Sequence, residues 1–219
     1  MIDLDLIQGL LLIAGGIATT LAISIFSLIF GLAIGLPLSF VRIYGGSLRF
    51  LVDGFEKIFR GIPELVLMLF FYLGIGAVFP VPFKNGFFTA VFVLGMRSGA
   101  NQSQIFRGAI RGIGEEQMVA SRSLGLSRLR SIAYVMIPQV FIFSTPGLGS
   151  EYALLVKDSA YAFVIGVPEI MKNADLVRAQ TYDYLVPYFA AAIFYILLTF
   201  PIATWLDVWG SRRKKKLGL

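Results

Sequence analysis

Nine polar residues lie within or at the ends of the long apolar runs of this chain. Their side chains could bind the charged groups of a ligand through ion pairs and hydrogen bonds. The nine residues are Glu64, Arg97, Ser98, Asn101, Gln102, Glu151, Lys157, Asp158 and Ser159. A charged group at membrane depth is costly to bury, so it usually faces a partner or a polar cavity. Arg97 could bind a carboxylate through two parallel hydrogen bonds, and Glu151 or Asp158 could bind an ammonium group. The structural alternative is an ion pair of Arg97 with Glu64 or Glu151 that holds two spans together.

The composition is that of a polytopic membrane protein, and it limits the reactions open to the chain. The 219 residues are 57% hydrophobic and 15% charged, with a mean hydropathy of +0.80. Because the sequence has no Cys and no His, it has no thiolate nucleophile, no thiolate or imidazole metal site and no histidine acid–base catalyst. It also has no Gly-x-x-x-x-Gly-Lys-Ser/Thr phosphate loop. We therefore expect no catalytic residues, no metal and no cofactor bound by this chain.

Five apolar spans must position the polar residues, within a single transmembrane domain over residues 1–219. We predict them at roughly 18–41, 62–78, 87–106, 131–156 and 185–206. Gly15 and Gly16 should separate an interfacial helix from the first span. Pro146, Gly147 and Gly149 should break the fourth span, and broken helices expose backbone groups that transporters use to hold solutes.

Charge gives the orientation. Most of the 19 Lys and Arg residues follow the first, third and fifth predicted spans, including the tail Arg212–Lys216. By the positive-inside rule the chain has its N-terminus outside and its C-terminus inside, with the loop at 107–130 in the cytoplasm. Membrane topology thus explains the net charge of +6, and no nucleic-acid partner is expected.

A second glycine pair lies in the first span. Gly31 and Gly35 form a Gly-x-x-x-Gly step, which lets a neighbouring helix approach closely. They could equally be scattered glycines in a lipid-facing helix.

The stretch from Glu115 to Pro138 is the most distinctive polar segment. Met118 to Leu124 can form a short helix, and Gly125 stands where a helix ends in the left-handed conformation. Ser127 can cap the next helix, which starts at Arg128. The pattern predicts a rigid cytoplasmic knob, although a basic loop attracted to the membrane surface would have a similar composition.

This stretch resembles the cytoplasmic signature loop of ABC-importer permeases of the polar amino-acid type. The matching residues are Gln117, Ala120, Arg122, Ser123, Leu124, Gly125, Leu126, Ser127 and Pro138. Val119 replaces a glutamate of that pattern, and Ser121 replaces an alanine. Arg60–Leu65, Ser98–Gly108, Thr145–Glu151 and Ile165–Ile170 resemble further motifs of the same permeases, in the same order.

The resemblance implies a type I ABC importer permease in a bacterial inner membrane. It implies a subunit that moves a polar or charged amino acid by alternating access, with ATP used by a separate ABC ATPase. Further implied partners are a second permease copy, identical or related, and an extracytoplasmic amino-acid-binding protein. The implied ATPase-coupling residues are Gln117, Ala120, Ser121, Arg122, Leu124, Gly125 and Leu126, and the nine polar residues above are the substrate candidates.

Two other classes remain as alternatives. An ATP-independent secondary transporter or channel would need an ion-coupling or selectivity site and usually internal repeats, and five spans show no inverted repeat. A membrane enzyme is disfavoured by the lack of His and Cys and by the absence of paired carboxylates on one helix face.

Overall fold

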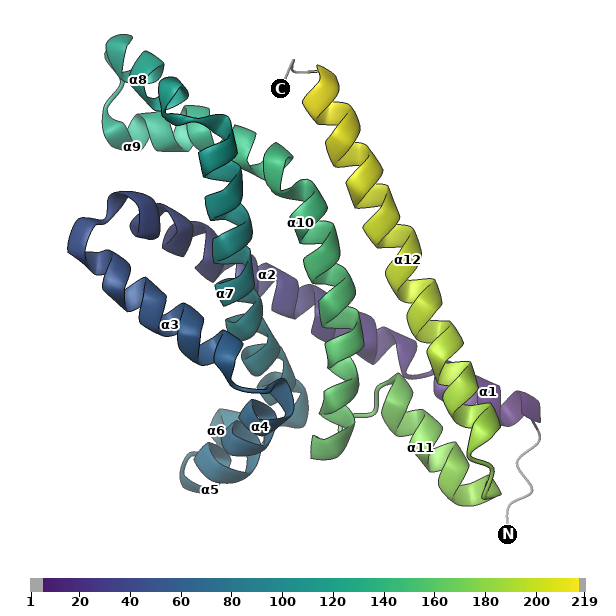
Figure 1. The fold of residues 1–219 in the computed structure, drawn as a ribbon. Coiled ribbons are helices and arrows are strands. Elements are labelled where there is room, and N and C mark those ends of the chain that lie inside the picture. Colours follow the sequence, from purple (N-terminus) through teal and green to yellow (C-terminus); the bar gives the residue numbers. More distant parts are fainter. Residues whose placement is uncertain (1–5, 217–219) are drawn as a thin grey trace.

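The computed structural model describes residues 6–216, and this part of the chain is helical with no strand. In Figure 1, α8 and α9 lie at one end of the molecule, and α4, α5, α6 and α11 lie at the other. The α-helices are α1 (Leu6–Ala14), α2 (Ile17–Tyr44), α3 (Arg49–Gly61), α4 (Glu64–Leu69), α5 (Gly76–Val78), α6 (Pro80–Phe83), α7 (Gly86–Ile113), α8 (Glu115–Ser123), α9 (Arg128–Ser131), α10 (Ile137–Asp158), α11 (Ile170–Thr181) and α12 (Leu185–Lys216). The 3-10 turns η1 (Gly46–Leu48) and η4 (Ser159–Ile165) and the π-helical turns η2 (Phe70–Ile75) and η3 (Ile132–Met136) join them. The all-α expectation is confirmed.

Within residues 6–216, three helical segments are long and apolar enough to cross a membrane: Leu6–Tyr44, Arg128–Ile165 and Leu185–Arg213. A fourth is possible if Gly46–Gly61 and Glu64–Val78, which meet at 98°, form one bent span. Helix α7 is not among them, because polar residues in its middle lower its hydropathy. Its 28 residues are nevertheless roughly 42 Å long, enough to cross a bilayer. The five-span count and the orientation therefore stay predictions.

The first span packs closely on α7 through its two glycines. A Cβ atom at Gly31 would lie 2.7 Å from Ser98 Oγ, and one at Gly35 would lie 2.8 Å from the Gly99 carbonyl oxygen. Distances this short leave no room for a side chain. The close-approach interpretation of Gly31 and Gly35 is confirmed, and the pair brings α2 against the helix that carries Arg97.

The division at Gly15 and Gly16 is also confirmed, because α1 ends at Ala14 and α2 begins at Ile17. Gly16 has a packing role as well. A Cβ atom there would lie 2.4 Å from the backbone nitrogen of Ile170, so the start of α11 rests directly on this glycine.

The predicted break in the fourth span is wrong. Helix α10 runs without interruption from Ile137 to Asp158 with Pro146 inside it. The two glycines serve contacts instead: a Cβ atom at Gly147 would lie 2.6 Å from Ile105 Cγ2, and one at Gly149 would lie 3.2 Å from Leu206 Cβ. Close packing on α7 and α12 explains these glycines, and it holds the helix together across the proline.

The irregular backbone of this segment lies earlier, at the π-helical turn η3. Pro138 follows it in the first turn of α10, where its missing N–H costs little. A proline ring clashes with the carbonyl four residues before it in an α-helix, and the wider π turn relieves that clash.

Two predicted boundaries differ from the structure around the cytoplasmic segment. Helix α7 continues to Ile113, so the first residues of the predicted loop 107–130 extend the helix that precedes it. The short helix α8 spans Glu115–Ser123, whereas Met118 to Leu124 was expected. Glu115 and Glu116 lie in its first turn, where carboxylates interact favourably with the helix dipole.

Candidate functional site

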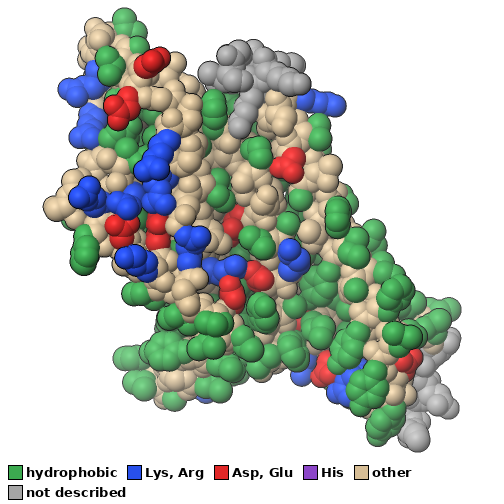
Figure 2. Space-filling model, viewed as in Figure 1, with side chains coloured by type: hydrophobic (Ala, Val, Ile, Leu, Met, Phe, Trp, Pro, Cys, Tyr) green, Lys and Arg blue, Asp and Glu red, His purple; other side chains and the backbone are tan. Residues whose placement is uncertain are grey.

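Helix α7 presents two different faces to its neighbours. Arg97, Asn101 and Gln104 are spaced four and three residues apart, so they share one side, called here the polar face. Ser98 and Gln102 are turned about 100° from it toward α2, on the packing face. Figure 2 shows acidic and basic side chains gathered over the region of α3 and α7, whereas hydrophobic side chains cover α4 to α6 and the lower half of α12.

Arg97 on the polar face joins three helices. Its Nε lies 2.5 Å from Glu64 Oε1 at the start of α4, and its Nη1 contacts Asp158 Oδ2 at the end of α10. The three side chains are 16%, 21% and 16% exposed, so water can still reach them. The predicted ion pair with Glu64 is therefore present, and Asp158 takes the place that Glu151 was expected to fill.

One turn further along α7, Asn101 links two more charged residues. Its Nδ2 donates to Glu151 Oε2 at 3.2 Å, and its Oδ1 accepts from Arg60 Nε at 3.0 Å. Glu151 is only 2% exposed, and its Oε1 has no hydrogen-bond partner among the described residues. We call Glu64, Arg97, Asn101, Glu151 and Asp158 the Arg97 cluster.

Gln102 lies outside this cluster, whereas Ser98 lies at its edge, with its hydroxyl beside the Glu151 carboxylate. Gln102 Nε2 donates to the Leu28 carbonyl oxygen at 3.0 Å and lies 2.9 Å from Ser98 Oγ, and both side chains are fully buried. They fill the space that the glycines of α2 leave open. The structure thus directs Gln102 toward α2 and places Ser98 between Gln102 and the Arg97 cluster.

Lys157 and Ser159 are also separate from the cluster. Lys157 is exposed and lines a groove of about 400 Å³ between α10 and α12, together with Thr199 and Asp207. Ser159 is buried and donates to the Val156 carbonyl oxygen at 2.8 Å, within its own turn. Of the predicted trio Lys157-Asp158-Ser159, only Asp158 contacts Arg97.

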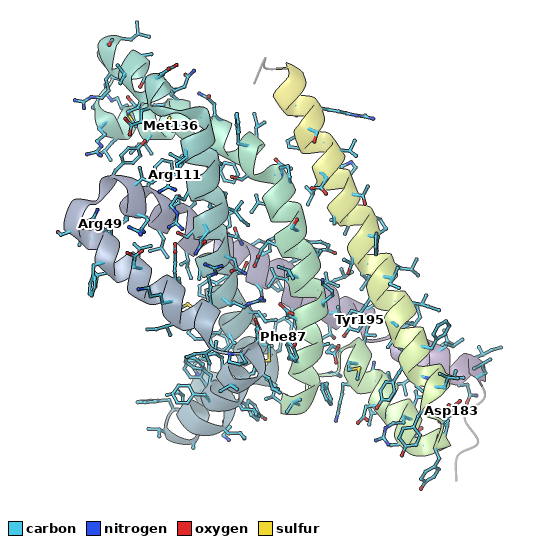
Figure 3. The ribbon with its side chains drawn as sticks, viewed as in Figure 1. Arg49, Phe87, Arg111, Met136, Asp183 and Tyr195 are labelled. Carbon is cyan, nitrogen blue, oxygen red and sulfur yellow. The ribbon has the colours of Figure 1, made fainter. Side chains whose placement is uncertain are left out.

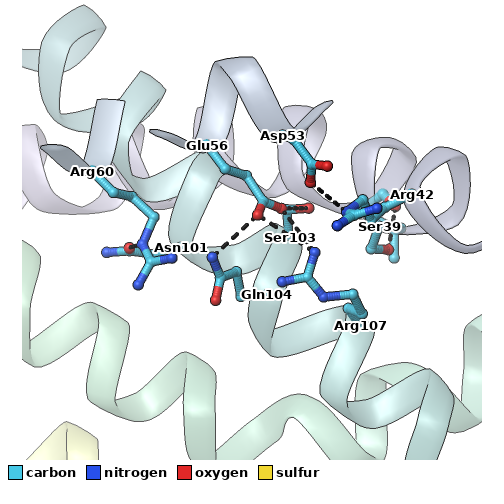
Figure 4. Close-up of polar contacts among 10 residues, drawn as sticks. Ser39, Arg42, Asp53, Glu56, Arg60, Asn101, Ser103, Gln104 and Arg107 are labelled. Carbon is cyan, nitrogen blue, oxygen red and sulfur yellow. Dashed lines mark hydrogen bonds and ion pairs between the residues drawn. The ribbon is translucent and has the colours of Figure 1, made fainter. Parts of the chain in front are cut away.

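The sequence analysis missed a second group of charges, which Figure 4 shows between α3 and α7. Glu56 is 5% exposed and accepts from Ser103 Oγ at 2.8 Å, from Gln104 Nε2 at 3.1 Å and from Arg107 Nη1 at 3.3 Å. Asp53, on the same helix, lies 2.6 Å from Arg42 Nε. The available signal was the spacing of Gln104 and Arg107, which continues the polar face.

The cytoplasmic segment has the predicted helix–glycine–helix geometry. Gly125 has a φ of +85°, its N–H donates to the Arg122 carbonyl at 2.9 Å, and the Leu126 N–H donates to the Ser121 carbonyl at 3.3 Å. This pair of bonds is a Schellman C-cap. Ser127 Oγ accepts from the Arg130 N–H at 3.4 Å and caps α9, as expected.

The segment has an exposed side and a buried base. Gln117, Ala120, Arg122, Leu124 and Gly125 are exposed, and Leu126 is half-buried. Ser121 is 4% exposed and donates to the Met118 carbonyl at 2.9 Å, so its side chain is turned into its own subunit.

Met118 anchors the base of the segment. It packs in a cluster with Phe106, Ile110 and Met136, which come from α7 and η3. Figure 3 labels Met136 directly below α8. Side-chain packing therefore connects α8 to α7, the helix that carries Arg97.

Comparison with known proteins shows which family and which proteins this chain resembles. The family described as "Binding-protein-dependent transport system inner membrane component" matches residues 27–215. The glutamine transport system permease protein GlnP of Escherichia coli K12 is 33% identical over 189 residues, covering 86% of each chain. The arginine transport system permease protein ArtQ of Bacillus subtilis 168 is 32% identical over 186 residues, covering 84% of each chain.

A solved structure agrees with these relatives. The crystal structure of an amino acid ABC transporter with histidines matches with a TM-score of 0.82 and 27% identity, over 96% of this chain and 100% of that chain. The family match covers both the polar face of α7 and the helix–glycine–helix segment at its end. This chain belongs to the family of binding-protein-dependent transport system inner membrane components.

Proposed function

We propose that this chain is the permease subunit of an ATP-driven importer of polar amino acids and that the Arg97 cluster contacts the solute. The observation that carries the proposal is the partly exposed Arg97 guanidinium shared by two carboxylates, with a third carboxylate, Glu151, held beside them by Asn101. An amino acid offers both of the groups that such a cluster can bind. Its carboxylate can replace Glu64 or Asp158 on Arg97, and its ammonium can meet the released carboxylates or Glu151.

The partners follow from the family and from the exposed side of α8. A separate ABC ATPase would contact the exposed residues of the 115–127 segment, a second permease copy would complete the pathway, and an extracytoplasmic binding protein would deliver the solute. When ATP closes the ATPase pair, the two segments would be drawn together. The packing of Met118 beneath α8 would then transmit the movement to α7 and open the pathway outward.

Arg97 variants test the site. Arg97→Gln removes the charge and Arg97→Lys keeps it without the two-pronged geometry. In the assembly reconstituted with its ATPase and binding protein, both should raise the solute concentration for half-maximal ATPase stimulation, by roughly tenfold or more for Arg97→Gln. The matched control is Arg111→Gln, an exposed arginine on the same helix near α8 (Figure 3), which should leave that concentration unchanged.

An unchanged solute dependence in folded Arg97→Gln would make the ion pairs purely structural. Measuring thermal unfolding of each variant in detergent separates the two cases, because a structural role predicts loss of stability without a shift in solute dependence. Uptake by the permease alone, without ATP, would instead favour the secondary-transporter alternative.

The orientation has its own test, which the absence of cysteine makes simple. A thiol introduced at Ser127, which is exposed after Gly125, should react only with reagent added from the cytoplasmic side. A thiol at Asn85, which caps α7, should react only from the outside. The reverse labelling would contradict the orientation with the N-terminus outside.

A further inference from the structure

A second polar pocket lies between α3 and α7, on the side of the Arg97 cluster that leads toward α8. Its volume is about 370 Å³, and its lining residues are Asp53, Glu56, Lys57, Arg60, Gly61 and Gln104. Gln104 is seven residues beyond Arg97 on α7, which is roughly 10 Å along the helix axis. We call this space the inner pocket.

One wall of the inner pocket is fixed by Glu56. This carboxylate is 5% exposed and receives hydrogen bonds from Ser103, Gln104 and Arg107 on α7 (Figure 4). These bonds hold α3 against α7 and use both Glu56 oxygens. The pocket therefore has a rigid side, and Glu56 is not free to bind a further cation.

The charged side chains of the pocket that form no ion pair among the described residues are positive. Asp53 already pairs with Arg42, and Glu56 with Arg107. Lys57 and Arg60 form no ion pair within residues 6–216, and Arg60 uses only its Nε, toward Asn101. The pocket thus offers one ammonium group and the two Nη atoms of a guanidinium to an incoming ligand.

The Arg97 cluster has the opposite balance. There, the carboxylates of Glu64 and Asp158 share a single guanidinium, and a third carboxylate, Glu151, bonds to the neighbouring Asn101. Asn101 connects the two places, because it donates to Glu151 and accepts from Arg60. A solute leaving the cluster along the polar face of α7 would pass from a carboxylate-rich environment to one in which the unpaired charges are positive.

We propose that the inner pocket binds the carboxylate of the transported solute after it leaves the Arg97 cluster, through Lys57 and Arg60. The inference rests on the proposed function and adds a second binding site, one that prefers the carboxylate of the solute. The two Nη atoms of Arg60 match the two oxygens of a carboxylate, and Lys57 adds a mobile point charge. Such a site would lower the barrier to release of the charged solute toward the cytoplasm.

The test measures direct binding to the full assembly without ATP and without the binding protein. The probes are L-arginine and L-glutamine, each paired with an analogue that lacks the free carboxylate: agmatine for arginine and the α-amide for glutamine. In the double variant that carries both Lys57→Gln and Arg60→Gln, the affinity for the amino acid that the wild type transports should fall roughly tenfold. The affinity for the analogue without a carboxylate should stay the same as in the wild type. The single variant Lys57→Gln should show part of the same loss of affinity. It should also reduce the rate of uptake at saturating solute.

Arg49→Gln is the matched control, because Arg49 is an exposed cation on α3 outside the pocket (Figure 3). It should change neither affinity. Equal loss for the amino acid and its analogue, or no loss in the Lys57 and Arg60 variants, would overturn the inner-pocket assignment. An effect shared by Arg49→Gln that disappears without anionic lipid would also overturn it, since these cations would then contact lipid headgroups.

The outcomes separate this inference from the proposed function. A wild-type assembly that neither binds nor transports any polar amino acid contradicts the proposed function itself. A wild-type assembly that transports normally, with Arg97-dependent affinity but no dependence on Lys57 and Arg60, contradicts only the inner pocket.

Discussion

The two faces of α7 carry similar polar residues with different consequences. On the packing face, Ser98 and Gln102 are fully buried, and Gln102 Nε2 donates to Ser98 Oγ and to the Leu28 carbonyl of α2. On the polar face, Arg97 and Asn101 contact charged residues of α3, α4 and α10 and remain partly accessible. A polar side chain at membrane depth can therefore be part of a helix–helix contact or of a site, and the helical register decides which.

The largest expected effect comes from filling the packing face. Gly31→Ala places a Cβ atom 2.7 Å from Ser98 Oγ and Gln102 Nε2, so α2 and α7 must move apart. We expect a loss of about 3 kcal/mol in stability, the upper part of the usual cost of overpacking. Thermal unfolding in detergent, followed by size-exclusion chromatography, measures it.

Gly108→Ala is the control for this substitution on α7, because a Cβ atom at Gly108 meets nothing within 4 Å. It should be neutral or slightly stabilising, since alanine restricts the unfolded chain. Equal stability of the Gly31 and Gly108 variants would contradict the close packing of α2 on α7.

Helix α7 and its neighbours also show which features of the structure could be predicted from the sequence. The helical type of the main elements, the close approach at Gly31 and the caps at Gly125 and Ser127 follow from local rules of hydropathy, glycine and capping. The sequence shows which residues are polar but not which neighbour each helix side meets, so it could not show that Gln102 turns away from Arg97 to the Leu28 carbonyl of α2. The predicted break at Pro146 failed for the same reason, since the adjacent glycines serve packing against α7 and α12.

The next effect concerns the hydrogen bonds by which Glu56 of α3 holds the polar face of α7. Glu56→Ala removes the acceptor of three α7 side chains and leaves Arg107, a 17% exposed cation, without its carboxylate. We expect a loss of about 2 to 3 kcal/mol, somewhat below the cost of breaking a fully buried pair. A double-mutant cycle with Arg107→Gln should recover part of this loss, because the unpaired charge is then absent.

Strictly additive losses in that cycle would mean that the pair contributes nothing beyond each side chain alone. In that case α3 would be held to α7 mainly by the Ser103 and Gln104 contacts. The Ser103→Ala variant then measures what remains, by the same thermal unfolding.

A third effect tests whether the polar face moves with the α8 segment. Gly125 has a φ of +85°, which a β-branched residue adopts only at a cost, so Gly125→Val should misdirect α8 without disturbing the Arg97 cluster. We expect a strain of about 1 to 2 kcal/mol and loss of coupling between ATP hydrolysis and uptake. Normal uptake with the ATPase still bound would contradict a role of this turn in coupling.

The smallest effect sharpens the comparison between the faces most directly, because it uses two residues only three positions apart. Ser98→Ala removes a hydroxyl from the packing face, where Gln102 Nε2 keeps its bond to the Leu28 carbonyl, so stability should fall by only about 1 kcal/mol. Ser98 bonds to neither Arg97 nor Asn101, although its hydroxyl lies beside Glu151, so the solute concentration for half-maximal ATPase stimulation should shift less than about twofold. Asn101→Ala removes a side chain of similar polarity from the polar face and frees both Glu151 and Arg60, so it should shift that concentration several-fold. A shift for Ser98→Ala equal to that for Asn101→Ala would mean that α7 turns its packing face toward the solute during transport, and the separation of the two faces would then hold for one conformation only.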